Sequence, residues 1–226
     1  MVDSVVAMVS HRQRLFWAIY KSKIGSTLYG KLAGKGSVLA FSAALNDFFM
    51  KHMPVGADIL EVGCGPGLQA IELVKRRSDI RLVASDFSDQ FVQLGMANWS
   101  KWKQHNRQIE QASTNSSLVF VQANAMDLSS FSPNSFDGIY SITAIKHFPD
   151  PIRGITECIR CLKPRGRLLF LEFYKECSID TMCNLARHFS IPRFLKPFMA
   201  RFIHFNLQHE SPSIEDVKNW LSAIDI

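Results

Sequence analysis

The sequence lacks an apolar run long enough to span a membrane. Its longest apolar stretches have the length of strands, and charges interrupt them before the roughly 18 residues that a membrane-spanning helix needs. Residues 1–20 also lack the basic start, apolar middle and small-residue cleavage site of a secretory signal. We therefore expect a soluble, cytoplasmic chain, whose 226 residues, 47% of them hydrophobic, can fill one core.

Cysteine is sparse and shows no regular framework. The five cysteines are an odd number, which favours reduced thiols over a set of disulfides. Cys158 and Cys161 form a C-x-x-C motif, but Cys177 and Cys183 have the wrong spacing for the second half of a zinc site. Cys158 instead falls on a helical apolar stripe, so we expect a core residue and no metal.

Dense runs of lysine and arginine are also missing. The net charge of +6 and the pI near 9.1 admit nucleic acid or an anionic membrane surface as partners, but the basic residues are scattered. The best local candidate for nucleic-acid contact is the pair Trp99 and Trp102 among basic residues. Their spacing of three residues on a helix is more typical of packing, with the lysine stems lying over the rings.

Glycine is concentrated at one place, where it follows an apolar strand. Residues 58–67 (DILEVGCGPG) place glycine at Gly63, Gly65 and Gly67, and a helical apolar stripe follows, with charged residues through Arg77 on its solvent side. Glycine accepts positive φ and lets a ligand lie against bare backbone. A second apolar run, residues 80–85, ends on Asp86, where dinucleotide-type folds place the carboxylate that binds ribose hydroxyls.

The details of this turn predict which cofactor it holds. A nicotinamide-binding turn has the order G-x-G-x-x-G, and here Leu68 stands where the third glycine belongs. Glu61, two residues before Gly63, would repel a pyrophosphate but would attract a ligand that carries ammonium and sulfonium charges. The turn therefore predicts a site for S-adenosylmethionine.

At this point the sequence resembles the class I S-adenosylmethionine-dependent methyltransferases, and within them the ubiquinone and menaquinone biosynthesis C-methyltransferases and related small-molecule enzymes. The resemblance rests on residues 60–67 (LEVGCGPG), 119–127 (VFVQANAMD), 135–141 (SFDGIYS) and 160–173 (RCLKPRGRLLFLEF). It implies a Rossmann-like, doubly wound parallel α/β sheet with helices on both faces. Because the chain stops soon after the expected last helix, we expect a sheet without the family's usual last two strands.

The resemblance also implies a set of site residues. Glu61, Gly63, Cys64 and Gly65 would hold the methionine portion of the cofactor, and Asp86 would bind the ribose. Phe87 would pack on adenine, Asn124 and Ala125 would contact the adenine edge, and Ser141 with Thr143 would lie beneath the methionine tail. His147 is the candidate catalytic base. From the residues alone, Asn124 could instead cap a turn, Ser141 could simply end a strand and His147 could be structural.

The flanking segments point to an apolar acceptor. Residues 1–54 predict a helical N-terminal cap or lid, and residues 55–226 the methyltransferase domain, with an acceptor-side segment at about 178–210. Both flanks are rich in aromatic residues, so we expect a small or lipidic acceptor, and the mixture of Phe with Arg and Lys in 178–210 also suits contact with a lipid surface. The sequence predicts no oligomeric state.

Two other functions stay open. One is a nucleic-acid methyltransferase, although residues 141–144 (SITA) lack the Asn/Asp-Pro-Pro-Tyr/Phe pattern of the nitrogen-methylating nucleic-acid enzymes. The other is a non-catalytic partner protein that keeps the fold. Methyl transfer needs mainly proximity and alignment, so the lack of a recognisable catalytic triad does not decide between these functions.

Overall fold

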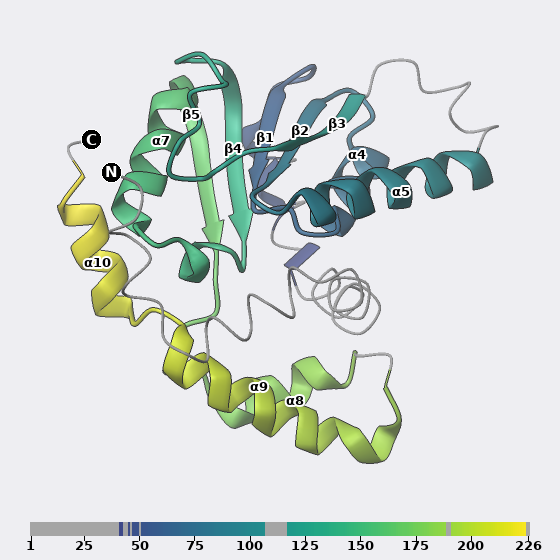
Figure 1. Cartoon of the computed structure of the whole chain (residues 1–226), viewed down its shortest axis with the longest axis vertical. Helices are drawn as coiled ribbons and strands as arrows, with labels where there is room; N and C mark the ends of the chain where they lie inside the picture. The colour runs from purple at the N-terminus through teal and green to yellow at the C-terminus, as the bar shows by residue number, and fades with distance from the viewer. Residues whose placement is uncertain are drawn as a thin grey trace.

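The computed structural model describes residues 41–42, 45, 47–49, 51–106, 117–188 and 191–224. Among these residues, five parallel strands form one sheet in the order β3-β2-β1-β4-β5 (Figure 1). The strands are β1 (Asp58–Val62), β2 (Arg81–Asp86), β3 (Ser117–Gln122), β4 (Phe136–Ile142) and β5 (Leu162–Leu171). The parallel Rossmann-like sheet that the alternation of strands and helices predicts is therefore confirmed.

Helices follow the strands along the chain. They are α4 (Leu68–Arg76), α5 (Asp89–His105), α7 (Pro151–Cys161), α8 (Ile179–Ala186), α9 (Lys196–Glu210) and α10 (Ile214–Ser222), with short 3₁₀ turns η2 (Ile145–His147) and η3 (Arg193–Leu195). Residues 41–52 are helical wherever they are described. The rest of the expected N-terminal cap, residues 1–40, lies outside the described part of the chain.

Successive residues of β1 point to opposite faces of the sheet, and each face has its own core. Ile59 packs with buried residues of β2, β4 and α4 and with Phe49, whereas Leu60 packs with Ile139 and Cys158 on the face covered by α7. Cys158 is fully buried, as expected of a core residue, and Cys161, the last residue of α7, is fully buried as well. The two layers of helices hold the sheet, and thereby the carboxyl ends of its strands, in a fixed arrangement.

One expectation about α4 is wrong. The sequence pattern places Arg77 on the solvent side, but its side chain is buried. The guanidinium donates to the backbone oxygens of Phe49 and Pro54 at 2.8 Å and forms an ion pair with Asp79. Arg77 therefore ties the carbonyl groups at the end of the helix before β1 to the end of α4, a long-range role that periodicity does not reveal.

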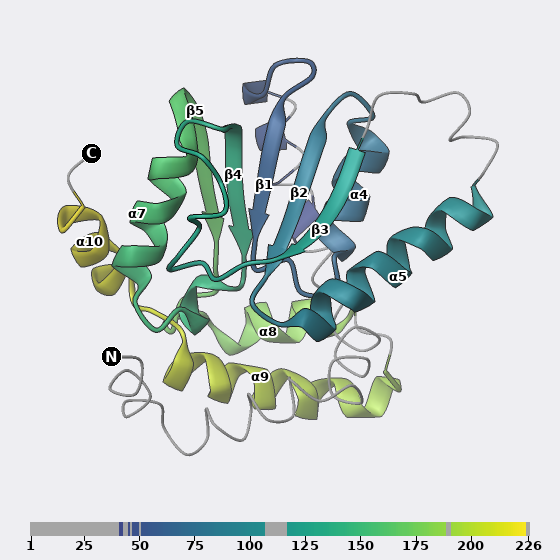
Figure 2. The ribbon, with the colours of Figure 1, turned by 45° about the horizontal axis from the view of Figure 1, so that its top comes forward.

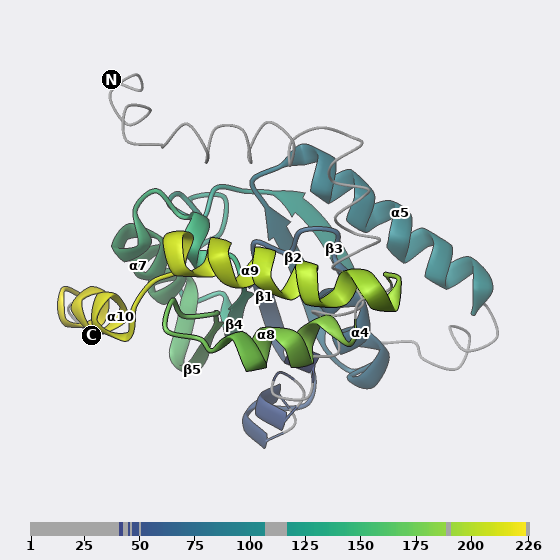
Figure 3. The ribbon, with the colours of Figure 1, turned by 90° about the horizontal axis from the view of Figure 1, so that it is seen from below.

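Helices α8 and α9 form a hairpin beyond the carboxyl end of the sheet. In Figures 1 and 2 the two helices lie below the strand tips, and Figure 3, the view from below, shows both crossing in front of the sheet. The hairpin has its own small core of Cys177, Met182, Ala186, Ala200 and Leu207. None of the described helices is long and apolar enough to cross a membrane.

Candidate cofactor and acceptor site

The three glycines after β1 all have positive φ, at 77° for Gly63, 52° for Gly65 and 72° for Gly67. A Cβ at Gly63 would lie 2.4 Å from the Cβ of Ala144, and one at Gly67 would lie 2.3 Å from the ring of Phe120. A Cβ at Gly65 would instead meet nothing within 4 Å. Gly63 and Gly67 are thus required by packing, while Gly65 presents bare backbone to open space, as a ligand platform does.

Neighbouring elements hold this glycine loop from two sides. The backbone oxygen of Ser85, in β2, accepts hydrogen bonds from the amides of Gly63 and Cys64 at 2.8 and 2.9 Å. The Asn98 side chain, in α5, donates to the Pro66 oxygen at 3.0 Å. Sequence reasoning missed Asn98, because nothing in the helical pattern shows that its side chain points at the loop.

Asp86 lies where the sequence predicts, at the carboxyl end of β2. One carboxylate oxygen accepts from the Gly65 amide and the other from the Ser88 amide, both at 2.8 Å. Asp86 therefore fixes the loop backbone, and each oxygen keeps a lone pair for a ligand hydroxyl. Burial raises the pKa of this carboxyl above its ordinary value, despite the two amide hydrogen bonds.

Glu61 is buried beneath the same loop. Its carboxylate accepts a hydrogen bond from the Tyr140 hydroxyl at 3.0 Å, across the pairing of β1 with β4. Burial, with a smaller contribution from the charge of Asp86, raises the pKa of Glu61 to about 8. Two acidic groups that lack a cationic partner among the described residues thus lie at one loop, and a cationic ligand would stabilise both as carboxylates.

The expected adenine side of the site lies at the ends of β2 and β3. Phe87 is 53% exposed, so part of its ring is open to a ligand. The side-chain oxygen of Asn124 accepts a hydrogen bond from the Met126 amide at 3.1 Å. Asn124 therefore caps a turn, which is the alternative role that the sequence leaves open for it. The Asn124 side chain therefore stabilises the corner, and Ala125 is buried beside it.

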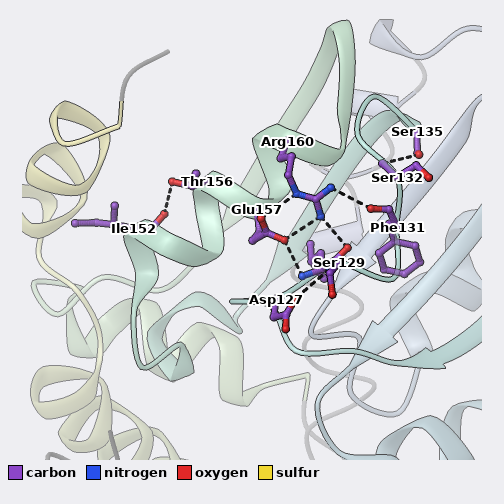
Figure 4. A network of polar contacts seen from close by, with 10 residues as sticks. Asp127, Ser129, Phe131, Ser132, Ser135, Ile152, Thr156, Glu157 and Arg160 are labelled. Atoms are coloured by element: carbon purple, nitrogen blue, oxygen red, sulfur yellow. Dashed lines mark hydrogen bonds and ion pairs between the residues drawn. The ribbon is translucent and has the colours of Figure 1, made fainter. Parts of the chain in front are cut away.

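An ion pair on α7 clamps the loop that follows this corner. Figure 4 shows Arg160 and Glu157 reaching toward the loop that carries Asp127 and Phe131. Glu157 accepts from the Leu128 amide at 2.8 Å, while Arg160 donates to the Leu128 oxygen at 2.8 Å and to the Phe131 oxygen at 3.0 Å. The hydrogen bond from Arg160 holds the pKa of Glu157 below its ordinary value. Sequence reasoning missed this clamp, because it joins residues about 30 positions apart.

The other side of the glycine loop is formed by the end of β4. Ser141 is buried, and within the described structure its hydroxyl has no hydrogen-bond partner. This hydroxyl lies beside the glycine loop, 4.0 Å from the position that a Cβ on Gly63 would take. Thr143 has a φ of 53°, a strained conformation for a β-branched residue that costs about 1–2 kcal/mol. An unpaired buried hydroxyl and local strain are features that ligand sites often carry.

Just beyond, η2 carries His147 next to a nearly buried ion pair. Burial, and then the charge of Lys146, lower the pKa of His147 to about 3. The Lys146 ammonium lies 3.0 Å from the carboxylate of Glu172, which follows β5, and this carboxylate also accepts from the Phe173 amide at 2.8 Å. The ion pair joins the carboxyl ends of β4 and β5, and sequence reasoning did not identify it.

The residues present fit S-adenosylmethionine. The open face at Gly65 suits a ligand that approaches the backbone, and the carboxyl groups of Glu61 and Asp86 suit a cation and ribose hydroxyls. The Ser141 hydroxyl, which has no partner among the described residues, suits a further polar contact. The same acidic groups would oppose a pyrophosphate.

The tryptophan pair on α5 packs rather than forming an open stacking platform. The rings of Trp99 and Trp102 stack on each other, with centroids 5.0 Å apart, and both lie against the core. The Lys103 ammonium lies 5.6 Å from the Trp99 ring centroid. This arrangement matches the packing interpretation of the sequence and does not favour nucleic-acid contact.

Comparison with known proteins agrees with this geometry. Residues 60–170 match the family described as "Methyltransferase domain". The ubiquinone/menaquinone biosynthesis C-methyltransferase of Rickettsia prowazekii is 33% identical over 134 residues, which are 58% of this chain and 50% of that protein. The sterol 24-C-methyltransferase of Aspergillus fumigatus is 27% identical over 162 residues, 70% of this chain and 40% of that protein.

A solved structure extends the likeness in fold to most of the chain. A candidate S-adenosyl-L-methionine-dependent methyltransferase from Methanococcus maripaludis superimposes with a TM-score of 0.66 at 19% identity, covering 91% of this chain and 85% of that one. The chain spans about half the length, or less, of the two curated relatives above. Through its matched domain, its parallel sheet and its glycine loop, this chain belongs to the class I S-adenosylmethionine-dependent methyltransferase family.

Proposed function

We propose that this chain transfers the methyl group of S-adenosylmethionine to a small apolar or amphipathic acceptor of lipid type. The observation that carries the proposal is the open backbone at Gly65, flanked by the carboxyl groups of Glu61 and Asp86. The names of two relatives, a quinone-biosynthesis and a sterol methyltransferase, support a lipidic acceptor.

In this proposal the cofactor residues divide by position. Gly63, Cys64 and Gly65 hold the methionine portion against the loop, and Glu61 balances its positive charge from below. Asp86 accepts the ribose hydroxyls while it keeps its bond to the Gly65 amide, and Ser141 supplies a hydrogen bond from the end of β4. Phe87 packs on the adenine, and Asn124 with Ala125 shapes the corner around its edge.

The bound cofactor supplies a methyl group that its sulfonium charge has already activated. The protein's main task is therefore to align the acceptor and to exclude water. The strained turn at Thr143 and the pair Lys146–Glu172 hold the ends of β4 and β5 in place beside the glycine loop. These ends form the rigid wall against which an acceptor would lie.

His147 is proposed to contact the acceptor as a neutral imidazole. A pKa near 3 makes this group a weak base, so it is better suited to hydrogen bonding than to removing a proton from an unactivated acceptor. If His147 contacts the acceptor, His147→Phe should raise the acceptor KM and leave cofactor affinity unchanged. A parent-chain kcat that depends on a group titrating between pH 5 and 8, with this dependence lost in His147→Phe, would instead assign His147 the role of general base.

The acceptor is proposed to enter beside the α8–α9 hairpin. The hairpin and the exposed Tyr174, which follows β5, lie toward the carboxyl edge of the sheet, the edge at which parallel α/β folds bind their ligands. Of the expected partner flank, the aromatic N-terminal residues, Phe41 is described and its ring centroid lies 5.1 Å from that of Phe173, whereas residues 1–40 fall outside the described part of the chain.

The test is methyl transfer from labelled S-adenosylmethionine to fractions of a metabolite extract, with the labelled product identified. We expect label in the lipid fraction, lost in Asp86→Ala, whose cofactor affinity should fall by about 1.5–3 kcal/mol. Label in RNA or DNA would overturn the acceptor class. Cofactor binding without turnover on any fraction would favour the non-catalytic partner role.

A further inference from the structure

Helix α9 has two apolar faces, and the described part of the chain covers only one of them. Met199, Ala200, Ile203 and Leu207 pack toward α8. On the opposite face of the helix a second stripe lies in solvent, starting in η3: it consists of Phe194, Phe198, Phe202 and Phe205, which are 79%, 72%, 57% and 48% exposed. Four exposed phenylalanines in one stripe are far more than a monomer scatters over its surface, so the stripe indicates an interaction surface.

The residues around the stripe are basic. From residue 181 to residue 209 the sequence has no Asp or Glu, but it has Arg187, Arg193, Lys196 and Arg201. Residues 181–209 therefore carry a net charge of +4, and Asp180 and Glu210 lie only at the two far ends of the hairpin, next to the rest of the chain. The partner of the stripe should therefore be apolar within and anionic at its surface.

A pocket at the loop that joins α8 to α9 shows the same combination of cations and apolar side chains. It has a volume of about 620 Å³ and is lined by Cys183, Arg187, Ile191, Arg193, Lys196 and Pro197. Three of these residues are cations, and Lys196 is oriented by donating to the Arg187 oxygen at 2.6 Å. The pocket lies between the end of α8 and the start of α9, next to Phe194 and Phe198 in the sequence. Such cations can bind the phosphate of a lipid headgroup, and the apolar side chains beside them can contact the glycerol region below it.

We propose that the α8–α9 hairpin docks on an anionic phospholipid membrane, with the phenylalanine stripe inserted below the headgroups and the basic pocket at a lipid phosphate. An amphipathic helix that lies in the interface has this composition, with Phe on the buried face and Arg and Lys at the headgroup level. The inference does not depend on the acceptor or on methyl transfer, because it concerns a surface made only of hairpin residues.

Vesicle sedimentation of the full-length chain tests the proposal without cofactor or acceptor. The vesicles are phosphatidylcholine alone, or an equal mixture with phosphatidylglycerol. We expect strong binding only to the mixture, weakened by salt, and lost in the double variant Phe198→Ser/Phe202→Ser. Arg193→Gln/Lys196→Gln should lower the partition coefficient for the mixture by roughly tenfold or more, since each cation near an anionic surface contributes about a factor of five.

Matched controls lie outside the hairpin. Val55→Ser/Val119→Ser removes two side chains that are 88% and 51% exposed, and Arg76→Gln/Lys101→Gln removes two exposed cations; both should bind as the parent chain does. Calorimetric binding of S-adenosylmethionine verifies that each variant is folded. Equal vesicle binding by all variants would overturn the proposal. A parent chain that self-associates but does not bind vesicles, with self-association lost in Phe198→Ser/Phe202→Ser, would also overturn it and would assign the stripe to a dimer interface.

Discussion

At the scale of single residues, Glu61 makes the unliganded fold sensitive to pH. Its pKa is about 8 in the folded chain and 4.5 in the unfolded one. Between these values the folded state keeps a proton that the unfolded state releases, so the contribution of Glu61 to stability is greatest below pH 4.5 and declines as pH rises to 8. Glu61→Gln should remove this decline and raise the free energy of unfolding at pH 8 by roughly 2 kcal/mol or more.

Urea unfolding of the cofactor-free chain at pH 5 and pH 8 measures this effect. The Gln side chain can still accept from Tyr140, which makes it a conservative replacement. Calorimetry in buffers of different ionisation enthalpy provides a second measurement: at pH 7 the parent chain should release a proton when it binds the cationic cofactor, and Glu61→Gln should not. An equal pH dependence in both chains would contradict the assignment.

The glycines provide a second residue-scale prediction. Gly65→Ala adds a methyl group to open space at a φ of 52°, so it should cost only about 1 kcal/mol of stability while it weakens S-adenosylmethionine binding by tenfold or more. Gly63→Ala, whose methyl would overlap Ala144, should destabilise the fold by several times as much. Thermal melts and calorimetry of the two variants separate these effects, and similar losses in both measurements would contradict the division of roles.

At the scale of elements, the ion pair on α7 fixes the adenine corner through the Leu128 backbone. Arg160→Leu should leave Glu157 without its cation and free the loop after β3, which we expect to lower cofactor affinity by about 1–2 kcal/mol although neither residue is placed at the cofactor. Arg153→Leu, on an exposed part of the same helix, is the matched control. Calorimetric titration checks the pair of variants. Equal affinities would show that the corner holds its shape without the clamp.

How far the sequence predicts these elements depends on how local their causes are. The strand, glycine turn and helix at residues 58–76 follow from periodicity and from glycine chemistry, and the structure confirms them. The sequence pattern predicts a strand over residues 167–173, but β5 begins at Leu162, because Leu162 already pairs with Phe136 of β4. Arg77, Asn98 and Tyr140 act through partners more than 20 positions away, and no local pattern shows such pairing. The ligand contacts of the site residues remain predictions.

At the scale of the whole molecule, docking and methyl transfer make a joint prediction. If the acceptor is lipidic and the hairpin docks on membranes, Phe194→Ser/Phe198→Ser should slow methylation of an acceptor presented in anionic vesicles by about tenfold or more. The same variant should act normally on that acceptor in detergent micelles and should bind S-adenosylmethionine as the parent chain does. Equal loss in vesicles and micelles would show that these side chains contact the acceptor itself.

The hairpin's separate core has a consequence for how the molecule opens. Because Met182, Ala186, Ala200 and Leu207 pack with one another rather than with the sheet, the hairpin can unfold as a unit while the strands stay paired. Amide hydrogen exchange should therefore show one shared, lower protection for α8 and α9 and a higher protection for β1 and β4. Such a unit can part from the sheet edge and reseat without global unfolding, which under the proposed function would admit a bulky acceptor and release the product.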